Sequence, residues 1–175
     1  MTIFRTGAVV AAMLAIMPVP VAAQAVSENR VERVTAWSVF VEQEPKECWV
    51  VSEPVNSVNT RDGQEVEVRR GDMLLFVTYR PESGVEGEVS FTGGYPYREG
   101  STVRLQVGDN GYDLITDGEW AWPASPEEDA QVVGVLKAGT DAVLTGVSSR
   151  GTTTRDTFSL IGITEALAEA EKRCQ

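Results

Sequence analysis

The chain has 175 residues, of which 42% are hydrophobic and 23% charged, with a formal net charge of −11, no histidine and two cysteines. This length fits one domain with a short appendage. The lack of histidine excludes Ser-His-Asp triads, Cys-His pairs and imidazole metal sites, and two cysteines cannot form a four-cysteine zinc site. The negative charge argues against a nucleic-acid partner, because such affinity rests on Lys and Arg neutralising phosphates. We therefore expect no catalytic set, metal or cofactor.

Residues 1–25 have the three parts of a secretory signal peptide. Arg5 supplies a basic start, residues 8–17 form an unbroken apolar run, and Ala23-Gln24-Ala25 matches the small-x-small cleavage pattern. The apolar run is shorter than the roughly 20 residues that a membrane-spanning helix needs. We predict cleavage after Ala25, which leaves a periplasmic or secreted chain without a transmembrane segment.

Export gives the two cysteines a structural meaning. Cys48 and Cys174 lie far apart in the sequence, and two cysteines in an exported domain most often pair. A redox-active pair is the alternative, but no C-x-x-C spacing supports it. We predict a Cys48–Cys174 disulfide that ties the C-terminus to the first part of the domain.

After a polar, flexible lead-in over residues 26–34, a single domain is expected over residues 35–175. It consists of short apolar or alternating segments separated by turn signals such as Asp109-Asn110-Gly111. Residues 74–77 are continuously apolar, as in a strand buried on both faces. The pattern predicts a mainly β fold, an antiparallel β-sandwich of the immunoglobulin-like or jelly-roll-like kind. The predicted strands are 37–41, 48–52, 66–69, 74–77, 88–91, 103–107, 112–115, 120–122, 142–147 and 152–160.

Two segments predict short helices instead. Ser125-Pro126-Glu127-Glu128 is a capping box with proline at the first helical position, and Gly139 provides a stop. The second helix follows Thr164 and leads to the C-terminus. Its apolar residues recur on one narrow face, with the second cysteine at the end of that stripe: Ile163, Ala166, Leu167, Ala170 and Cys174.

The candidate ligand or partner residues lie in loops and on one short strand. Two tryptophans project to the same side of that strand and could stack on a sugar ring, although such aromatics are more often core. A Gly/Pro loop with tyrosines could contact a partner or form a packed turn. The serines of a later hairpin loop are not a G-x-S-x-G nucleophile elbow, because arginine interrupts the motif. These candidates are Trp120, Trp122, Tyr95, Tyr97, Arg98, Ser148, Ser149 and Arg150.

Local structure explains the acidic clusters without a functional site. Residues 109–113 lack the twelve-residue spacing of an EF-hand, and a hairpin turn accounts for them. Glu127, Glu128 and Asp129 suit the positive N-terminal end of the predicted helix. A carboxylate-dependent glycan hydrolase would need two acids facing each other across a cleft.

Several motifs, taken in order, resemble the invasion-associated locus B family of exported proteins, best known from alphaproteobacteria. Near the start stands Cys48-Trp49-Val50-Val51-Ser52, and Gly94-Tyr95-Pro96 and Glu99-Gly100-Ser101 occupy the middle. Ala121-Trp122-Pro123 precedes the first helix, and Asp156-Thr157-Phe158-Ser159-Leu160-Ile161-Gly162 precedes the last. The resemblance spans about Trp37 to Cys174, and Ile163 stands where the family would have an aromatic residue.

The resemblance implies a β-sandwich-like export domain in which Cys48 and Cys174 match the first and last family cysteines. Some members are associated with bacterial entry into host cells, and the family brings no catalytic residues.

Three hypotheses about function follow. We favour a non-enzymatic envelope or secreted interaction protein whose partner is a protein or another envelope component. The second is a periplasmic small-ligand or glycan-binding module that uses the two tryptophans and two tyrosines named above. The third is a carboxylate enzyme.

Overall fold

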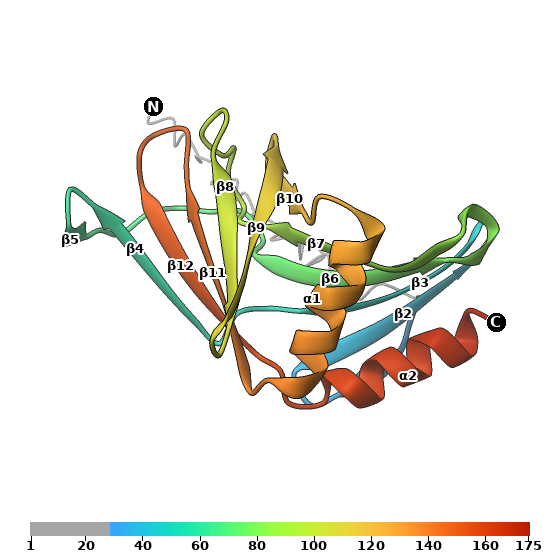
Figure 1. Cartoon of the computed structure of the whole chain (residues 1–175). Helices are drawn as coiled ribbons and strands as arrows, with labels where there is room; N and C mark the ends of the chain where they lie inside the picture. Colours follow the sequence, from blue (N-terminus) through green and yellow to red (C-terminus); the bar gives the residue numbers. More distant parts are fainter. Residues whose placement is uncertain (1–28) are drawn as a thin grey trace, which may run out of the picture.

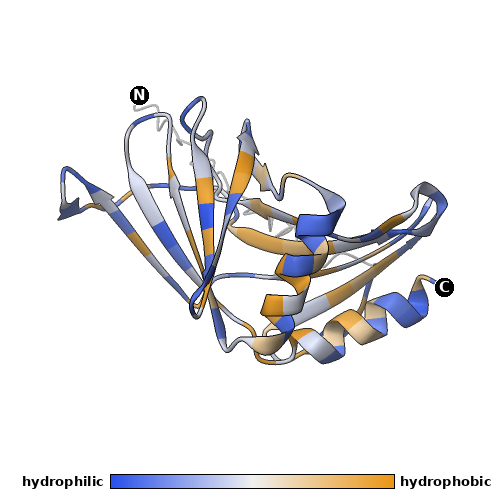
Figure 2. Cartoon of the chain, viewed as in Figure 1, coloured by the Kyte–Doolittle hydropathy of each residue, from blue (hydrophilic) through white to orange (hydrophobic). Residues whose placement is uncertain are grey.

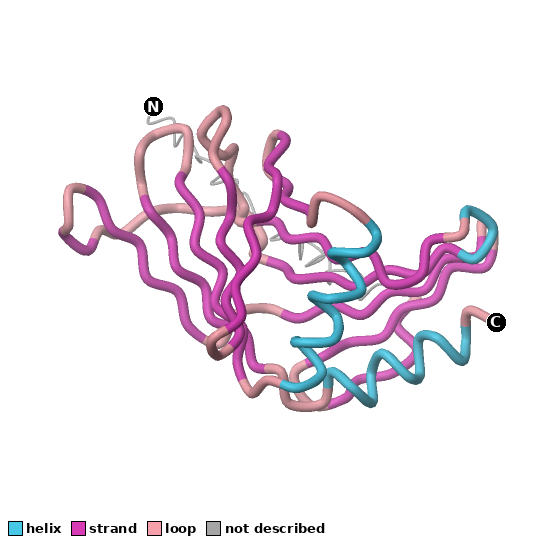
Figure 3. The backbone as a smooth tube through the Cα atoms, viewed as in Figure 1, coloured by secondary structure: helices cyan, strands magenta, loops and turns pink. Residues whose placement is uncertain are grey.

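The structure, a computed structural model, describes residues 29–175, so the predicted signal peptide lies outside the described residues (Figure 1). Strands dominate the described chain, with two α-helices and a short 3-10 helix (Figure 3). None of the helices in this part is long and apolar enough to cross a membrane. The strands are β1 (Arg30–Val34), β2 (Trp37–Gln43), β3 (Lys46–Ser52), β4 (Asn56–Arg61), β5 (Gln64–Glu65), β6 (Leu74–Arg80), β7 (Val85–Thr92), β8 (Thr102–Val107), β9 (Asn110–Asp117), β10 (Trp120–Trp122), β11 (Asp141–Val147) and β12 (Thr153–Ser159). The helices are η1 (Pro81–Ser83), α1 (Pro126–Ala138) and α2 (Ile163–Arg173).

One 12-stranded sheet runs through the whole fold in the order β1-β2-β3-β6-β7-β10-β9-β8-β11-β12-β4-β5. The sheet bends strongly, so that β4, β11 and β12 stand steeply against β2, β3 and β6 (Figure 1). Phe91 of β7 meets Phe158 of β12 edge to face, with ring centroids 5.9 Å apart, so both halves contribute to one core. The predicted mainly β, antiparallel architecture with two helices is confirmed. The two layers expected of a sandwich are the two halves of this continuous sheet.

Alternation along the strands explains which face of the sheet is buried. Val39 pairs with Val50, which in turn pairs with Val77 on β6, and all three side chains are fully buried. Helix α2 lies against β2 and β3, and α1 lies against β7, so both helices cover this inner face. Apolar and hydrophilic residues alternate accordingly along the strands and around the helices (Figure 2). Leu74 and Phe76 are only half-buried, so β6 is buried on one face rather than on both.

Polar stretches account for the differences from the predicted strands. β1 lies inside the expected lead-in 26–34 and pairs with β2 as an edge strand. β4 is polar on both faces and pairs with β12, so its pairing has no hydrophobic signature. Residues 66–69 were expected to form a strand and form none; the Val66 N–H bonds the Asn59 carbonyl, and the Arg70 side chain that follows binds the buried Asp156.

The turn and capping signals were largely correct. The β8–β9 hairpin turns at residues 108–109, with Gly108 at φ +55°, which is earlier than the Asn110-Gly111 turn that the sequence predicts. The Glu128 N–H donates to Ser125 Oγ at 3.3 Å at the start of α1, as the capping box requires. Glu128 Oε2 accepts from the Ala124 N–H at 2.7 Å, one residue before the Ser125 N–H that a capping box would use.

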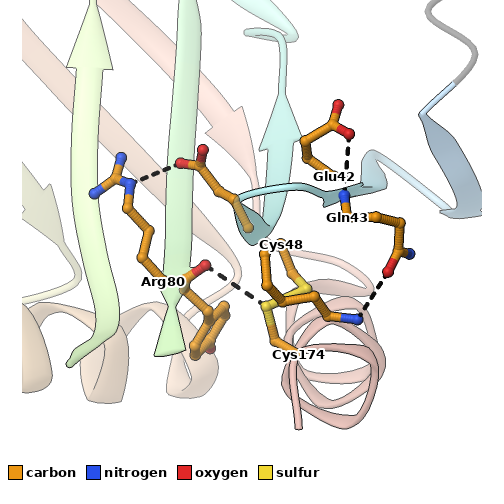
Figure 4. The surroundings of a disulfide bond; sticks show 8 residues. Glu42, Gln43, Cys48, Arg80 and Cys174 are labelled. Carbon is orange, nitrogen blue, oxygen red and sulfur yellow. Dashed lines mark hydrogen bonds and ion pairs between the residues drawn. A yellow bond between two sulfur atoms is a disulfide. The ribbon is translucent and has the colours of Figure 1, made fainter. Parts of the chain in front are cut away.

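The C-terminal helix is attached to the sheet by covalent and polar contacts. Cys48 of β3 and Cys174 after α2 form the predicted disulfide, with Cα atoms 5.8 Å apart (Figure 4). Tyr79 donates a hydrogen bond to Glu171 Oε1 at 3.0 Å. Gly162, at φ +91°, begins the helix where a Cβ would lie 2.8 Å from the Val34 carbonyl oxygen. A side chain at this position would therefore push the helix away from β1.

Candidate functional site

Six of the eight sequence candidates lie on two surfaces that share no lining residue. Trp120 and Trp122 belong to the aromatic face, defined as five half-buried or exposed rings on the outer side of the sheet: Phe40, Trp49, Phe76, Trp120 and Trp122. Tyr95, Ser148, Ser149 and Arg150 belong to the arginine pocket, a cavity of about 460 Å³. Its four arginines are Arg61, Arg69, Arg70 and Arg150.

Adjacent strands place the aromatic face in a row. Phe40 of β2 and Trp49 of β3 are register partners and stack with centroids 5.3 Å apart and an interplanar angle of 2°. Trp120 contacts Phe76 at 5.8 Å and Trp122 at 6.2 Å between centroids. The two tryptophans therefore share one side of β10, as their spacing predicts. The rings cover Thr78 and Ser90, which are almost fully buried on this outer side.

Charged residues border both ends of the aromatic face. Arg80 of β6 binds Glu47 at 2.7 Å and Glu88 at 2.9 Å, and this triad lines a depression of about 330 Å³ beside the tryptophans. At the other end, Arg30 and Arg33 lie by the groove that contains Phe40 and Trp49. The face is thus an apolar centre with a charged rim.

Three connections that are distant in sequence form the walls of the arginine pocket. They are residues 67–70 between β5 and β6, residues 94–96 after β7, and the β11–β12 hairpin. The first two connections touch through the Gly71 N–H, which donates to the Gly94 carbonyl at 2.8 Å. A Cβ on Gly94, whose φ is +71°, would lie 2.5 Å from the Gly71 carbonyl oxygen. Only glycine allows this close approach.

A buried ion pair supports the pocket from below. The Arg70 guanidinium donates to both oxygens of Asp156, at 2.8 and 2.5 Å, while the two side chains are only 6% and 0% exposed. Arg70 also donates to the Gly93 carbonyl at 2.8 Å, and Ser57 donates to Asp156 at 2.6 Å. These bonds satisfy much of the remaining hydrogen-bonding capacity of the buried charges, which such a pair requires.

The two tyrosine candidates have different environments. Tyr95 is half-buried under the Arg70 guanidinium, 5.1 Å from its ring centroid, and its hydroxyl bonds Thr154 Oγ1 at 2.5 Å. Tyr97 is buried, and its hydroxyl has no hydrogen-bond partner among residues 29–175. Burial raises the pKa of both hydroxyls, so both stay neutral at physiological pH. Tyr97 therefore presents no surface to a ligand, while Arg98 is exposed beside the hairpin.

The acidic clusters do not assemble a paired-carboxylate site. Burial raises the pKa of Asp129 to about 6, against the opposing effect of the Val89 N–H that it accepts at 2.8 Å. The pKa of Glu127 is lowered by hydrogen bonds from its own N–H and from Ser125. Within residues 29–175, no group of three His, Cys, Asp or Glu is placed to hold a metal.

Sequence reasoning missed three of the five rings of the aromatic face and three of the four arginines of the pocket. Phe40, Trp49 and Phe76 occupy outward positions of β2, β3 and β6, and an inward face was predicted only for the first of these strands. Asp156 was noted only as part of a motif, although a charge at an inward position between Thr154 and Phe158 signals a buried partner. Arg61 and Arg69 carried no local signal, because their pocket forms only when distant connections meet.

Comparisons with known proteins agree with this fold. A sequence profile of the invasion associated locus B (IalB) family matches residues 37–171. The crystal structure of invasion associated protein B from Bartonella henselae aligns with a TM-score of 0.54 at 19% identity, covering 81% of this chain and 95% of that chain. At that identity the similarity concerns the fold alone. No curated protein matches significantly.

Proposed function

Because this chain belongs to the invasion associated locus B family, we propose that it is an exported, non-enzymatic interaction protein that binds a protein partner through its aromatic face. The partner belongs to the bacterial envelope or, in a host-associated bacterium, to the host surface. The proposal assigns export to the predicted signal peptide, which precedes residue 26. The disulfide is consistent with that location, since such bonds persist in oxidising compartments.

The exposed row of aromatic rings carries the proposal. Trp120 is 39% exposed and sits between Phe76 and Trp122 on a sheet face that neither helix covers. Contiguous apolar patches with a polar rim mark interaction sites on soluble proteins. Tryptophan and arginine contribute a large share of the binding energy at such sites.

Contacts among the rings favour a protein over a glycan. A sugar ring binds by lying flat on a free aromatic face, but Phe40 and Trp49 already cover one face of each other. A protein can pack apolar side chains against the ring edges and the outer sides of the row. Arg30 and Arg33 form no ion pair with any described residue, so we expect acidic groups on the partner at that end.

A specific observation favours the glycan alternative. The depression of about 330 Å³ beside Trp120 and Trp122 also contains Glu47, Arg80 and Glu88, which could hydrogen-bond sugar hydroxyls. Of the two tyrosines expected to assist, Tyr95 lies in the arginine pocket and Tyr97 is buried, so this subsite would rest on the tryptophans alone.

The binding test compares the wild-type chain with the double variant Phe76→Ser/Trp120→Ser. Partners crosslinked to the wild type in envelope extract are identified and purified, and their dissociation constants are then measured. The proposal expects at least about tenfold weaker binding for the double variant. Ile161→Ser is the matched control, because it removes an apolar side chain that is 63% exposed outside the face. Equal affinity of the double variant and the wild type would refute the proposal.

Tryptophan fluorescence distinguishes the glycan alternative. Trp49, Trp120 and Trp122 lie on the face, whereas Trp37 is fully buried, so a ligand on the face alters the emission. Saturable quenching by peptidoglycan fragments, lost in Trp120→Ser, would replace the protein partner with a glycan.

Fractionation of the producing bacterium tests export separately. We expect a chain that begins at residue 26 in the periplasm or the medium, and an uncleaved cytoplasmic chain would contradict it.

A further inference from the structure

The arginine pocket is a second site with a different chemistry from the aromatic face. In a chain with a net charge of −11, four of its twelve arginines line this one cavity, accompanied by two acids, Glu67 and Glu119. Its volume of about 460 Å³ falls in the range of small-molecule sites, roughly 300–1,000 Å³.

Three of the four guanidinium groups are available to a ligand. Arg61, Arg69 and Arg150 are exposed, and none forms an ion pair with any residue in the described part of the chain. Arg70 is different, because its charge is already matched by Asp156. The pocket lining therefore has three arginines without an ion-pair partner among the described residues, against the two carboxylates of Glu67 and Glu119.

The interior of the pocket supplies neutral hydroxyl groups. Ser148, Thr152 and Thr154 are buried at its wall, and Tyr95 bonds Thr154. Arg61 donates to Thr152 Oγ1 at 2.7 Å, which holds its guanidinium against the wall instead of leaving it free in solvent. Hydroxyls can donate or accept hydrogen bonds, so they suit the hydroxyl or carbonyl groups of an organic molecule.

The support beneath the pocket is rigid. The Arg70–Tyr95 contact and the Gly71–Gly94 hydrogen bond join the first two connections, and the Ser149 N–H, which donates to the Pro96 carbonyl at 2.9 Å, joins the hairpin to them. A site whose walls are held before binding loses less freedom when a ligand enters. Pre-organisation of this kind distinguishes the cavity from arginines that are merely adjacent on a surface.

We propose that the arginine pocket binds a small organic anion whose carboxylate or phosphate group is held by Arg61, Arg69 and Arg150. Guanidinium groups recognise both oxyanions through paired N–H donors. The polar part of the ligand contacts the Ser148, Thr152 and Thr154 hydroxyls. The site is separate from the aromatic face and can be present whether or not that face binds a partner.

Calorimetric titrations test the proposal at constant ionic strength, with citrate, glycerol 3-phosphate and inorganic phosphate as probes and glycerol as the neutral control. We expect saturable binding of at least one organic anion and none of glycerol. A preference for citrate would identify a carboxylate ligand, and a preference for glycerol 3-phosphate a phosphorylated one. Binding of inorganic phosphate as tight as that of both organic anions would contradict the assignment of the hydroxyl wall.

Two variants localise the binding. Arg69→Gln and Arg150→Gln should each weaken it about tenfold, since each removes charge-assisted hydrogen bonds. Neither side chain forms a hydrogen bond within the described residues, so both variants should fold, and unchanged thermal midpoints without ligand verify this. Arg155→Gln removes an exposed arginine outside the pocket and should leave the affinity within about twofold. Equal loss in all three variants, or no saturable anion binding to the wild type, would overturn the proposal.

Discussion

Arg70 and Asp156 form a bidentate ion pair inside the fold although they are 86 residues apart in the sequence. The pair joins the connection before β6 to the middle of β12, and its arginine lines the arginine pocket. It therefore connects fold stability to the geometry of a candidate site.

Asp156→Asn should be strongly destabilising. It leaves the Arg70 guanidinium buried without its counter-charge, which costs about 3–5 kcal/mol in the free energy of unfolding. Urea denaturation measures this difference. Asp113→Asn breaks the exposed pair with Arg104, 3.1 Å apart, and should cost less than about 1 kcal/mol. Equal effects of the two variants would show that burial of the Arg70–Asp156 pair is unimportant.

Loss of the disulfide should loosen the C-terminal helix. The bond closes a loop with a sequence separation of 126, so Cys48→Ser/Cys174→Ser should lower the free energy of unfolding by about 2–5 kcal/mol. Denaturation of the oxidised wild type, the reduced wild type and the double variant measures the effect. The reduced wild type should match the variant. A reduced protein as stable as the oxidised one would contradict this prediction.

Asp129 should make stability fall as the pH rises through mildly acidic values. Its pKa is raised from 3.8 to about 6 by burial, so the folded state holds a proton that the unfolded state has lost between these values. The stabilisation is complete below about pH 4 and is lost as the pH passes 6. Solvent screening of this half-exposed carboxyl limits the effect to about 1 kcal/mol.

Asp129→Asn tests this pH dependence. The amide keeps an oxygen to accept the Val89 N–H but does not titrate. The variant should therefore be more stable than the wild type at pH 7 and nearly equal to it at pH 4, as measured by urea denaturation at both values. If the wild type gained stability relative to the variant between pH 4 and pH 7, the prediction would be wrong.

Substitutions on the two faces of the sheet should lower the free energy of unfolding by different amounts. Phe91→Ala removes a fully buried ring from the junction of the two halves and should cost about 3–5 kcal/mol. Trp120→Ala removes a ring on the outer face and should cost about 1 kcal/mol, the size of its aromatic contacts. Thermal or urea denaturation of both variants checks the difference. Comparable losses would mean that the aromatic face belongs to the core.

The sequence by itself determined the features that depend on local pattern. The alternation of Trp37, Val39 and Val41 predicts β2 and its buried face, and Ser125 predicts the start of α1. The apolar stripe that ends at Cys174 predicts α2 and is consistent with the disulfide. These signals are local because side-chain periodicity and capping arise within a few residues.

Only the tertiary structure decided how the strands are ordered and which distant side chains meet. β4 is polar on both faces and takes its place by pairing with β12. Residues 66–69, expected to form a strand, instead form a connection that leads to the buried Arg70–Asp156 pair. The bend of one sheet, rather than a stack of two, brings Arg61, Arg69 and Arg150 to one pocket. Long-range pairing and buried charge leave no periodic trace along the chain, because their partners lie many residues away.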